Sequence, residues 1–166
     1  IPIKGTGLAA NGALLAQGET DAHWMITSGP GITSPQPAVS SFVSSPYIRT
    51  PQAGWVWVNS SGRAGIEQYY EFSRDVDIGT ADPSSVMLTG DWAADNFGEV
   101  YLNGAPATGT GRLVLPRGDV KNLPAANAFA ITSGLRPGVN TLSFRVTDTG
   151  APGGLLAWNL RVVPKR

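Results

Sequence analysis

Alternation of apolar and polar residues is the dominant pattern of this chain. The clearest runs are 67–78, 141–148 and 155–163, where apolar side chains recur at every second position. Alternation over this length is typical of a β-strand with one buried face. We expect about eight to ten strands in all, and no segment repeats apolar residues with the period of a helix. The pattern therefore predicts an all-β fold.

The stretch 90–104 predicts how two of these strands are joined. One strand runs through Trp92 into a polar corner at Asp95-Asn96, and a second strand, 99–102, ends at Asn103-Gly104. Asn-Gly after a β-patterned run favours a tight hairpin turn, because both residues tolerate positive φ. Trp92 and Val100 are expected in the core.

Strands at this spacing, each with one apolar face, indicate two antiparallel sheets packed face to face. We expect one antiparallel two-sheet β-sandwich domain over residues 1–166, built as a jelly roll, with an immunoglobulin-like sandwich as the alternative. Residues 1–21 are rich in Gly and Ala and are interpreted as an N-terminal strand arm.

Several shorter elements follow from the same pattern. Residues 13–16 are expected to form a hairpin arm or an edge strand, and 55–58 a strand. Residues 105–127 are expected to be mostly loop with a strand at 113–115. Arg74 interrupts the apolar face of its strand, which favours a bulge or a strand end there. Core positions are predicted for Trp24, Trp92 and Trp158.

Composition and charge exclude several functional classes. Lys plus Arg equals Asp plus Glu, 12 each, so no net charge draws the chain to nucleic acid or to an anionic membrane. There is no cysteine, which excludes disulfides and thiolate metal sites. No apolar run reaches the roughly 20 residues of a membrane span. Five Trp, four Tyr and five Phe argue against disorder.

Three segments resemble a known family. Asp95-Asn96 with Val-Tyr-Leu-Asn-Gly at 100–104, Leu-Arg-Pro-Gly-Val-Asn-Thr-Leu at 135–142, and Tyr-Glu-Phe-Ser-Arg-Asp-Val-Asp at 70–77 are similar to consecutive strands of the galactose-binding-like jelly roll. That domain is found as the sugar-binding domain of family 2 glycoside hydrolases. The resemblance implies a non-catalytic binding domain and a structural Ca²⁺ ion.

The N-terminal run 5–24 resembles secreted bacterial proteins of the PEP-CTERM kind. This resemblance implies an extracellular or cell-surface protein whose signal peptide has been removed. The chain ends at Val-Pro-Lys-Arg without an apolar sorting segment, so we expect it either to be released from its anchor or never to have had one.

Carbohydrate binding uses aromatic faces that stack on sugar rings beside polar groups. The candidates are Trp55, Trp57, Tyr69 and Tyr101. Trp55 and Trp57 fall on one strand face, and the choice between a sugar-binding face and a core position stays open for both. A structural Ca²⁺ would need converging oxygen ligands, for which Asp91, Asp95, Asn96 and Asp148 are the candidates. The alternative role for these side chains is the capping of turns.

Catalysis is not expected. The only histidine, His23, adjoins Trp24, and no Gly-x-Ser-x-Gly turn accompanies it. The acidic residues Glu67, Glu71, Asp75 and Asp77 share one strand face, which is typical of a solvated surface rather than of two carboxylates facing across a cleft.

Self-assembly is the remaining class. An edge strand accepts a strand from another chain, and the apolar arm is a candidate donor through Ile1, Ile3, Leu8, Leu14 and Leu15. The alternative is an arm that folds back on its own domain. We expect first a secreted structural or adhesion protein that assembles with copies of itself into a fibre or matrix. The alternative is a carbohydrate-binding module with an extracellular polysaccharide as partner.

Overall fold

The structure is a computed structural model that describes all residues from 1 to 166. It is all-β, as the alternation predicts, and every paired strand is antiparallel to its neighbours. The single helix is a 3-10 turn at Pro83–Ser85. No helix in the structure has the length and apolarity that a membrane crossing requires.

The strands are β1 (Pro2–Ile3), β2 (Thr20–Ser28), β3 (Gln36–Ser40), β4 (Val56–Trp57), β5 (Tyr69–Asp77), β6 (Val86–Asp95), β7 (Phe97–Leu102), β8 (Ala105–Pro106), β9 (Thr108–Gly111), β10 (Val114–Leu115), β11 (Asn127–Ser133), β12 (Val139–Thr147) and β13 (Gly154–Pro164).

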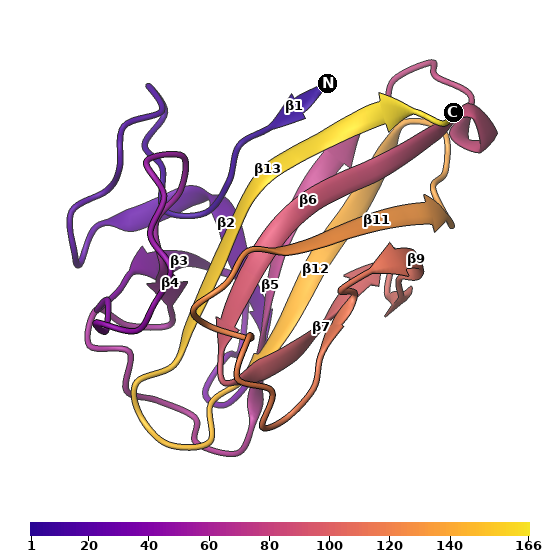
Figure 1. Cartoon of the computed structure of the whole chain (residues 1–166). Coiled ribbons are helices and arrows are strands. Elements are labelled where there is room, and N and C mark those ends of the chain that lie inside the picture. Colours follow the sequence, from indigo (N-terminus) through magenta and orange to yellow (C-terminus); the bar gives the residue numbers. More distant parts are fainter.

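The strands form one continuous sheet in the order β10-β7-β12-β5-β2-β3-β4-β13-β6-β11-β9. The sheet curls round into a near-barrel, with β7, β12 and β5 on one side and β13, β6 and β11 on the other (Figure 1). β1 pairs with β13 and β8 with β7. The path is open between β9 and β10, so these two strands mark its ends.

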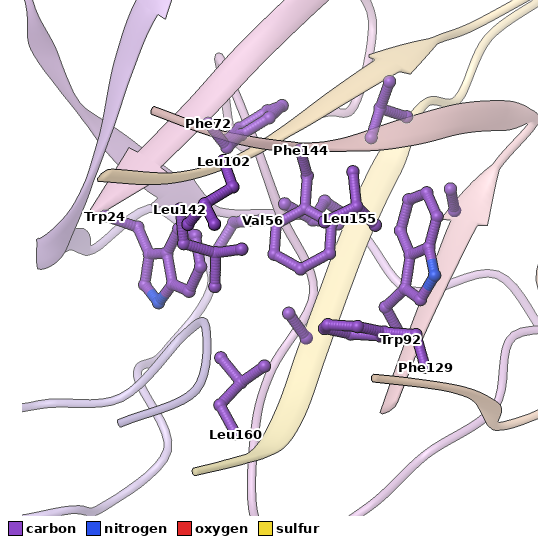
Figure 2. Close-up of a cluster of buried hydrophobic side chains, with 14 of the residues drawn as sticks. Trp24, Val56, Phe72, Trp92, Leu102, Phe129, Leu142, Phe144, Leu155 and Leu160 are labelled. Atoms are coloured by element: carbon purple, nitrogen blue, oxygen red, sulfur yellow. The ribbon is translucent and has the colours of Figure 1, made fainter. Parts of the chain in front are cut away.

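The core fills the space that the curled sheet encloses. Phe144 of β12 lies at its centre, with ring centroids 5.0 Å from Trp92, 5.7 Å from Trp24 and 6.0 Å from Phe129 (Figure 2). These aromatic partners come from opposite sides of the near-barrel, so one aromatic cluster holds the two sides together. Trp24, Trp92 and Trp158 are buried, as predicted.

The turn chemistry of the stretch 90–104 is confirmed. Asn103 and Gly104 have φ angles of 52° and 80°, and the turn joins β7 to β8 through the pair Leu102 and Ala105. Asn103 also donates to Asn140 Oδ1 at 2.9 Å. Asn140 is fully buried and holds the turn before β12 by donating to the carbonyl of Arg136. The two asparagines thus connect the end of β7 to the start of β12.

Arg74 does not interrupt β5. The pairing of β5 with β12 continues without a shift, and Arg74 lies opposite Leu142. Its guanidinium donates to the carbonyl of Lys4 at 2.7 Å and lies 5.8 Å from the Trp24 ring centroid. The predicted bulge is therefore wrong, because the backbone of the N-terminal arm accepts the polar end of this inward-facing side chain.

Other boundaries differ from the sequence prediction. The predicted strand 55–58 is reduced to the two residues of β4, and residues 105–127 contain β8 and β9 in addition to the expected β10. The predicted hairpin at 13–16 is reduced to a single bridge between Leu8 and Leu14.

Candidate functional site

The outer surface of β5, β12 and β7 brings together two of the four predicted sugar-binding aromatics. Tyr70, Phe72, Val100 and Phe144 point into the core, so alternate residues of the same strands point outward. The outward residues include Tyr69 and Glu71 of β5, Arg145 of β12, and Glu99 and Tyr101 of β7. We call these five residues the tyrosine face.

Arg145 is the centre of the tyrosine face. It lies opposite Glu71 on one neighbouring strand and opposite Glu99 on the other. Its guanidinium carbon is 3.9 Å from the Tyr101 ring centroid and 4.9 Å from that of Tyr69. The two tyrosines, 32 positions apart in sequence, therefore become neighbours through one cation.

Hydrogen bonding fixes this cation in place. Arg145 Nε donates to Glu71 Oε2 at 2.7 Å, and this bond is the main cause that raises the pKa of Arg145 above its ordinary value. Both side chains are partly shielded from solvent. A charge-assisted bond in such a position orients the guanidinium plane, and with it the two tyrosine rings.

A hollow of about 570 Å³ adjoins the tyrosine face at Tyr69. Arg117 lines it and donates two hydrogen bonds to Glu67, of 2.7 and 2.8 Å. The Arg117 guanidinium lies 5.5 Å from the Phe97 ring centroid. Hydrogen bonding by Arg117 is the main cause that lowers the pKa of Glu67, so the carboxylate is ionised. The hollow is lined by Ser28, Gly29, Pro30, Glu67, Gln68, Tyr69, Phe97, Arg117 and Thr147.

The other two predicted aromatics lie in the interior and do not belong to the tyrosine face. Trp57 is fully buried, and its ring lies 5.2 Å from Tyr70 and 5.6 Å from Phe72. Trp55 is 3% exposed, stacks 4.2 Å from Tyr47 and belongs to a separate hydrophobic cluster. Of the two alternatives left open for Trp55 and Trp57, the structure shows the buried one, and their assignment as exposed sugar-binding residues is corrected.

Glycines of β13 and of the loop before it explain why both indoles turn inward. A Cβ at Gly153 would lie 2.6 Å from Trp57 Cζ2, and one at Gly154 would lie 2.7 Å from Trp55 Cε3. The two rings therefore occupy space that only adjacent glycines leave open. The sequence feature that indicates the inward rings is the pair Gly153-Gly154. It can be interpreted only when the pairing of β4 with β13 is known.

The four predicted metal ligands do not form one site. Asp91 accepts a hydrogen bond from Asn159 on β13, whereas Asp95, Asn96 and Asp148 lie at the corner between β6 and β7. There Asn96 Oδ1 already accepts from the backbone and the hydroxyl of Thr149. No group of three acidic, His or Cys side chains is poised to hold a metal. The residues present do not fit the six to eight oxygens of a Ca²⁺ site.

The same corner contains a buried polar cluster that the sequence analysis missed. The hydroxyl of Tyr47 donates to Asp95 Oδ2, while Asp95 Oδ1, Asp148 Oδ2 and Trp57 Nε1 are buried without partners. Burial, reinforced by the nearby charge of Asp148, raises the pKa of Asp95 to about 6. Burial also raises the pKa of Asp148 and that of the Tyr47 hydroxyl. Tyr47 comes from an irregular loop, so no periodic pattern indicated it.

The single histidine, His23, lies beside the buried carboxylate of Asp21. Asp21, which is fully buried, accepts hydrogen bonds from the backbone N–H groups of His23 and Gly7. His23 Nδ1 lies 3.6 Å from Asp21 Oδ1. Burial is the largest influence on Asp21 and raises its pKa. Through the bond from Gly7, Asp21 connects β2 to the N-terminal arm.

The N-terminal arm lies on its own chain. β1 pairs with β13 at Pro2–Arg161 and Ile3–Leu160, and the terminal ammonium of Ile1 donates to the Val162 carbonyl at 2.8 Å (Figure 1). Of the predicted assembly residues, Leu8 is buried, Ile3 and Leu15 are half-buried, and Ile1 and Leu14 are exposed. The alternative of an arm folded back on its own domain is the arrangement in this structure.

Comparisons with known proteins place the chain in no family. No family model matches it, and no curated protein matches its sequence. Among solved structures, it is similar to the enzymatically active domain of tailspike protein 4 from bacteriophage CBA120, with a TM-score of 0.44 and 14% sequence identity. The match covers 96% of this chain and 21% of the tailspike chain, so this chain spans about a fifth of the length of that solved chain.

Proposed function

We propose that this protein is a secreted, non-catalytic carbohydrate-binding module that holds a saccharide on the tyrosine face and in the hollow beside it. The observation that carries the proposal is the pair of outward-facing tyrosines fixed on either side of Arg145. The corresponding fold proposal is a jelly roll of the galactose-binding-like type, with its ligand on the outer surface of β5, β12 and β7.

The chemistry of the surface favours a neutral saccharide. Glu71 pairs with Arg145 and Glu67 with Arg117, so both cations are already neutralised. Glu99 adds a further negative charge to the same surface. A uronic acid would be repelled there, whereas the hydroxyls of a neutral sugar would accept from guanidinium N–H groups and donate to carboxylate oxygens.

The hollow supplies the two features that pyranose recognition requires. Tyr69 and Phe97 offer apolar ring surface for the C–H face of a sugar. Gln68 and the Glu67–Arg117 pair offer hydrogen-bonding groups at its edge. Both side chains of the pair are exposed. Their outer N–H groups and lone pairs therefore remain free to bind sugar hydroxyls.

A glycan array followed by calorimetry tests the proposal. Wild-type protein should bind neutral glycans in preference to uronic-acid polymers, and Tyr69→Ala or Tyr101→Ala should weaken binding at least about tenfold, since each removes a stacking ring. Tyr101→Phe is the matched control, because it keeps the ring, and it should bind nearly as wild type. An array without hits, or binding that both alanine variants retain, would contradict the proposal.

Self-association is a second candidate function, favoured by β9. This strand is exposed at all four positions and pairs only with β11, so its other edge is free. It contains no charge and no proline, the residues that usually protect such edges. Addition of a strand from another copy would build an extracellular fibre. Light scattering should then show large species that Thr110→Lys abolishes, and a wild-type monomer at all accessible concentrations would exclude this candidate.

A further inference from the structure

A second pocket lies between the N-terminal arm and the loop that precedes β4. Its volume is about 430 Å³, within the range of small-molecule sites. We call it the arm pocket. It does not overlap the tyrosine face or its hollow, and none of the residues discussed under the proposed function lines it. Its twelve lining residues come from the arm and from the segments 40–43 and 49–55, and they include Leu14, Phe42, Arg49 and Trp55.

Close backbone contact builds this pocket. A Cβ at Gly7 would lie 2.7 Å from Gly54 Cα, so the arm approaches the loop more closely than a side chain permits. Gly54 N donates to the Thr6 carbonyl at 2.8 Å and Thr6 Oγ1 donates to the Gly54 carbonyl at 2.8 Å. Leu15 N donates to the Gly7 carbonyl at 2.9 Å, which fixes the wall that the arm contributes. The pocket is therefore preformed.

Apolar surface is left open around it. Six of the twelve lining residues are hydrophobic. Two of these six, Leu14 and Phe42, are 52% and 44% exposed. The buried ring of Trp55 forms part of the lining and is held by a bond from its Nε1 to the Ile48 carbonyl at 2.9 Å. Two large exposed apolar side chains facing one depression gain stability by contact with an apolar ligand.

The charge of the arm pocket is positive and uncompensated. Arg49 is its only charged lining residue, and no Asp or Glu lines it. The Arg49 guanidinium donates only to the carbonyls of Ser44, Ser45 and Tyr47, each at 3.4 Å, and it takes part in no ion pair. A carboxylate would replace these long bonds with short, charge-assisted ones.

We infer that the arm pocket binds a small organic carboxylate whose apolar body lies against Leu14, Phe42 and Trp55 and whose carboxylate pairs with Arg49. This inference is independent of the proposed function, because a different surface and different side chains carry it. An aryl-alkanoate such as 4-phenylbutyrate has the required chemistry, with a ring for the aromatic wall and a flexible stem that reaches the guanidinium.

Titration calorimetry with 4-phenylbutyrate and its neutral isostere 4-phenylbutyramide tests the inference. The carboxylate should bind wild-type protein about tenfold more tightly than the amide, the ratio expected for one charge-assisted hydrogen-bonded contact. Arg49→Gln should remove this preference and Arg49→Lys should keep part of it. Arg136→Gln, at an exposed arginine outside the pocket, should behave as wild type.

Two further variants separate the apolar part of the site from the carboxylate part. Leu14→Ser should weaken both ligands by a similar factor without impairing folding, because the side chain is already half exposed. Tyr101→Ala should leave both affinities unchanged. The inference is overturned if wild-type protein shows no saturable binding, if acid and amide bind equally, or if Arg49→Gln retains the wild-type preference.

Discussion

At the scale of single residues, buried polar groups determine how the protein responds to pH. Asp95 accepts from Tyr47 in a buried corner with no cation nearby, and its pKa of about 6 lies above the ordinary value of 3.8. The folded protein therefore holds this proton more tightly than the unfolded chain does. The stabilisation is fully present below about pH 4 and is lost as pH rises through 6.

Thermal unfolding between pH 4 and pH 8 should show this dependence. We expect wild-type protein to lose up to about 3 kcal/mol of stability over that range from Asp95. Asp95→Asn should lose much less, since a neutral amide still accepts from Tyr47. Asp75→Asn, at an exposed carboxyl of β5, is the matched control. A wild-type midpoint that rises from pH 5 to pH 7.5 would show the opposite sign.

Gly153, beside the Trp57 ring, gives a second prediction for a single residue. Gly153→Ala places a methyl group 2.6 Å from Trp57 Cζ2 and 2.9 Å from Asp148 Cβ, so the core must shift. We expect a loss of about 1–3 kcal/mol in the free energy of unfolding, measured in urea. Gly150→Ala is the control, because a Cβ there meets nothing within 4 Å. Equal stability of the two variants would argue against the placement of Trp57.

At the scale of elements, the N-terminal arm is a structural part of the domain. Thr6 is fully buried, and its hydroxyl donates to Gly54 and accepts from the backbone N–H of Ala157 at 3.1 Å. The arm thereby connects the loop before β4 to β13. Such a connection explains why an apolar segment that suggested strand donation to another chain is paired within its own.

Thr6→Val tests the role of the arm. The substitution keeps the shape but leaves the Gly54 carbonyl and the Ala157 N–H short of a partner, which costs about 1–3 kcal/mol. Urea unfolding measures the loss, and hydrogen exchange should show faster opening at β1 than at β5. Thr110→Val on the exposed strand β9 is the control. A Thr6→Val protein with wild-type stability and exchange would mean that the arm is not anchored there.

The alternating segments of β5 and β12 were predictable from the sequence because one face of each packs on the core. The alternation predicted for 155–163 was wrong, because a register shift between Trp158 and Arg161 divides the apolar residues of β13 between two hydrophobic clusters. In β12, Leu142, Phe144 and Val146 are buried as the alternation predicts, and Asn103-Gly104 forms the expected turn. The short strands β8 and β9 were not predicted, and β4 was predicted too long. Two to four residues carry no period, and their pairing depends on neighbours that are distant in sequence.

At the scale of the whole molecule, the candidate site depends on contacts that no local pattern reveals. The outward positions of Tyr69 and Arg145 follow from alternation, but their meeting with Tyr101 depends on the register of three strands. Arg117 reaches Glu67 from a loop 50 positions away. Trp55 and Trp57 were misassigned for the same reason, since the glycines that admit their rings lie near the other end of the chain.

The charge balance of the molecule gives a prediction for binding. With 12 basic and 12 acidic residues and both site arginines paired, affinity for a neutral glycan should change less than about twofold between low and high salt. Calorimetry at two ionic strengths measures this. A steep fall in affinity with salt would point instead to an anionic ligand.

A ¹⁵N–¹H NMR titration of wild-type protein, with the neutral oligosaccharide that it binds best on the array, tests directly whether the tyrosine face binds the saccharide. We expect saturable shifts at the backbone amides of β5, β7 and β12 around Tyr69, Tyr101 and Arg145, and at Glu67 and Gln68 in the hollow. No comparable shifts are expected at Leu14, Phe42 or Arg49 in the arm pocket. Shifts confined to the arm pocket, or no saturable shifts at the tyrosine face, would contradict saccharide binding at the tyrosine face.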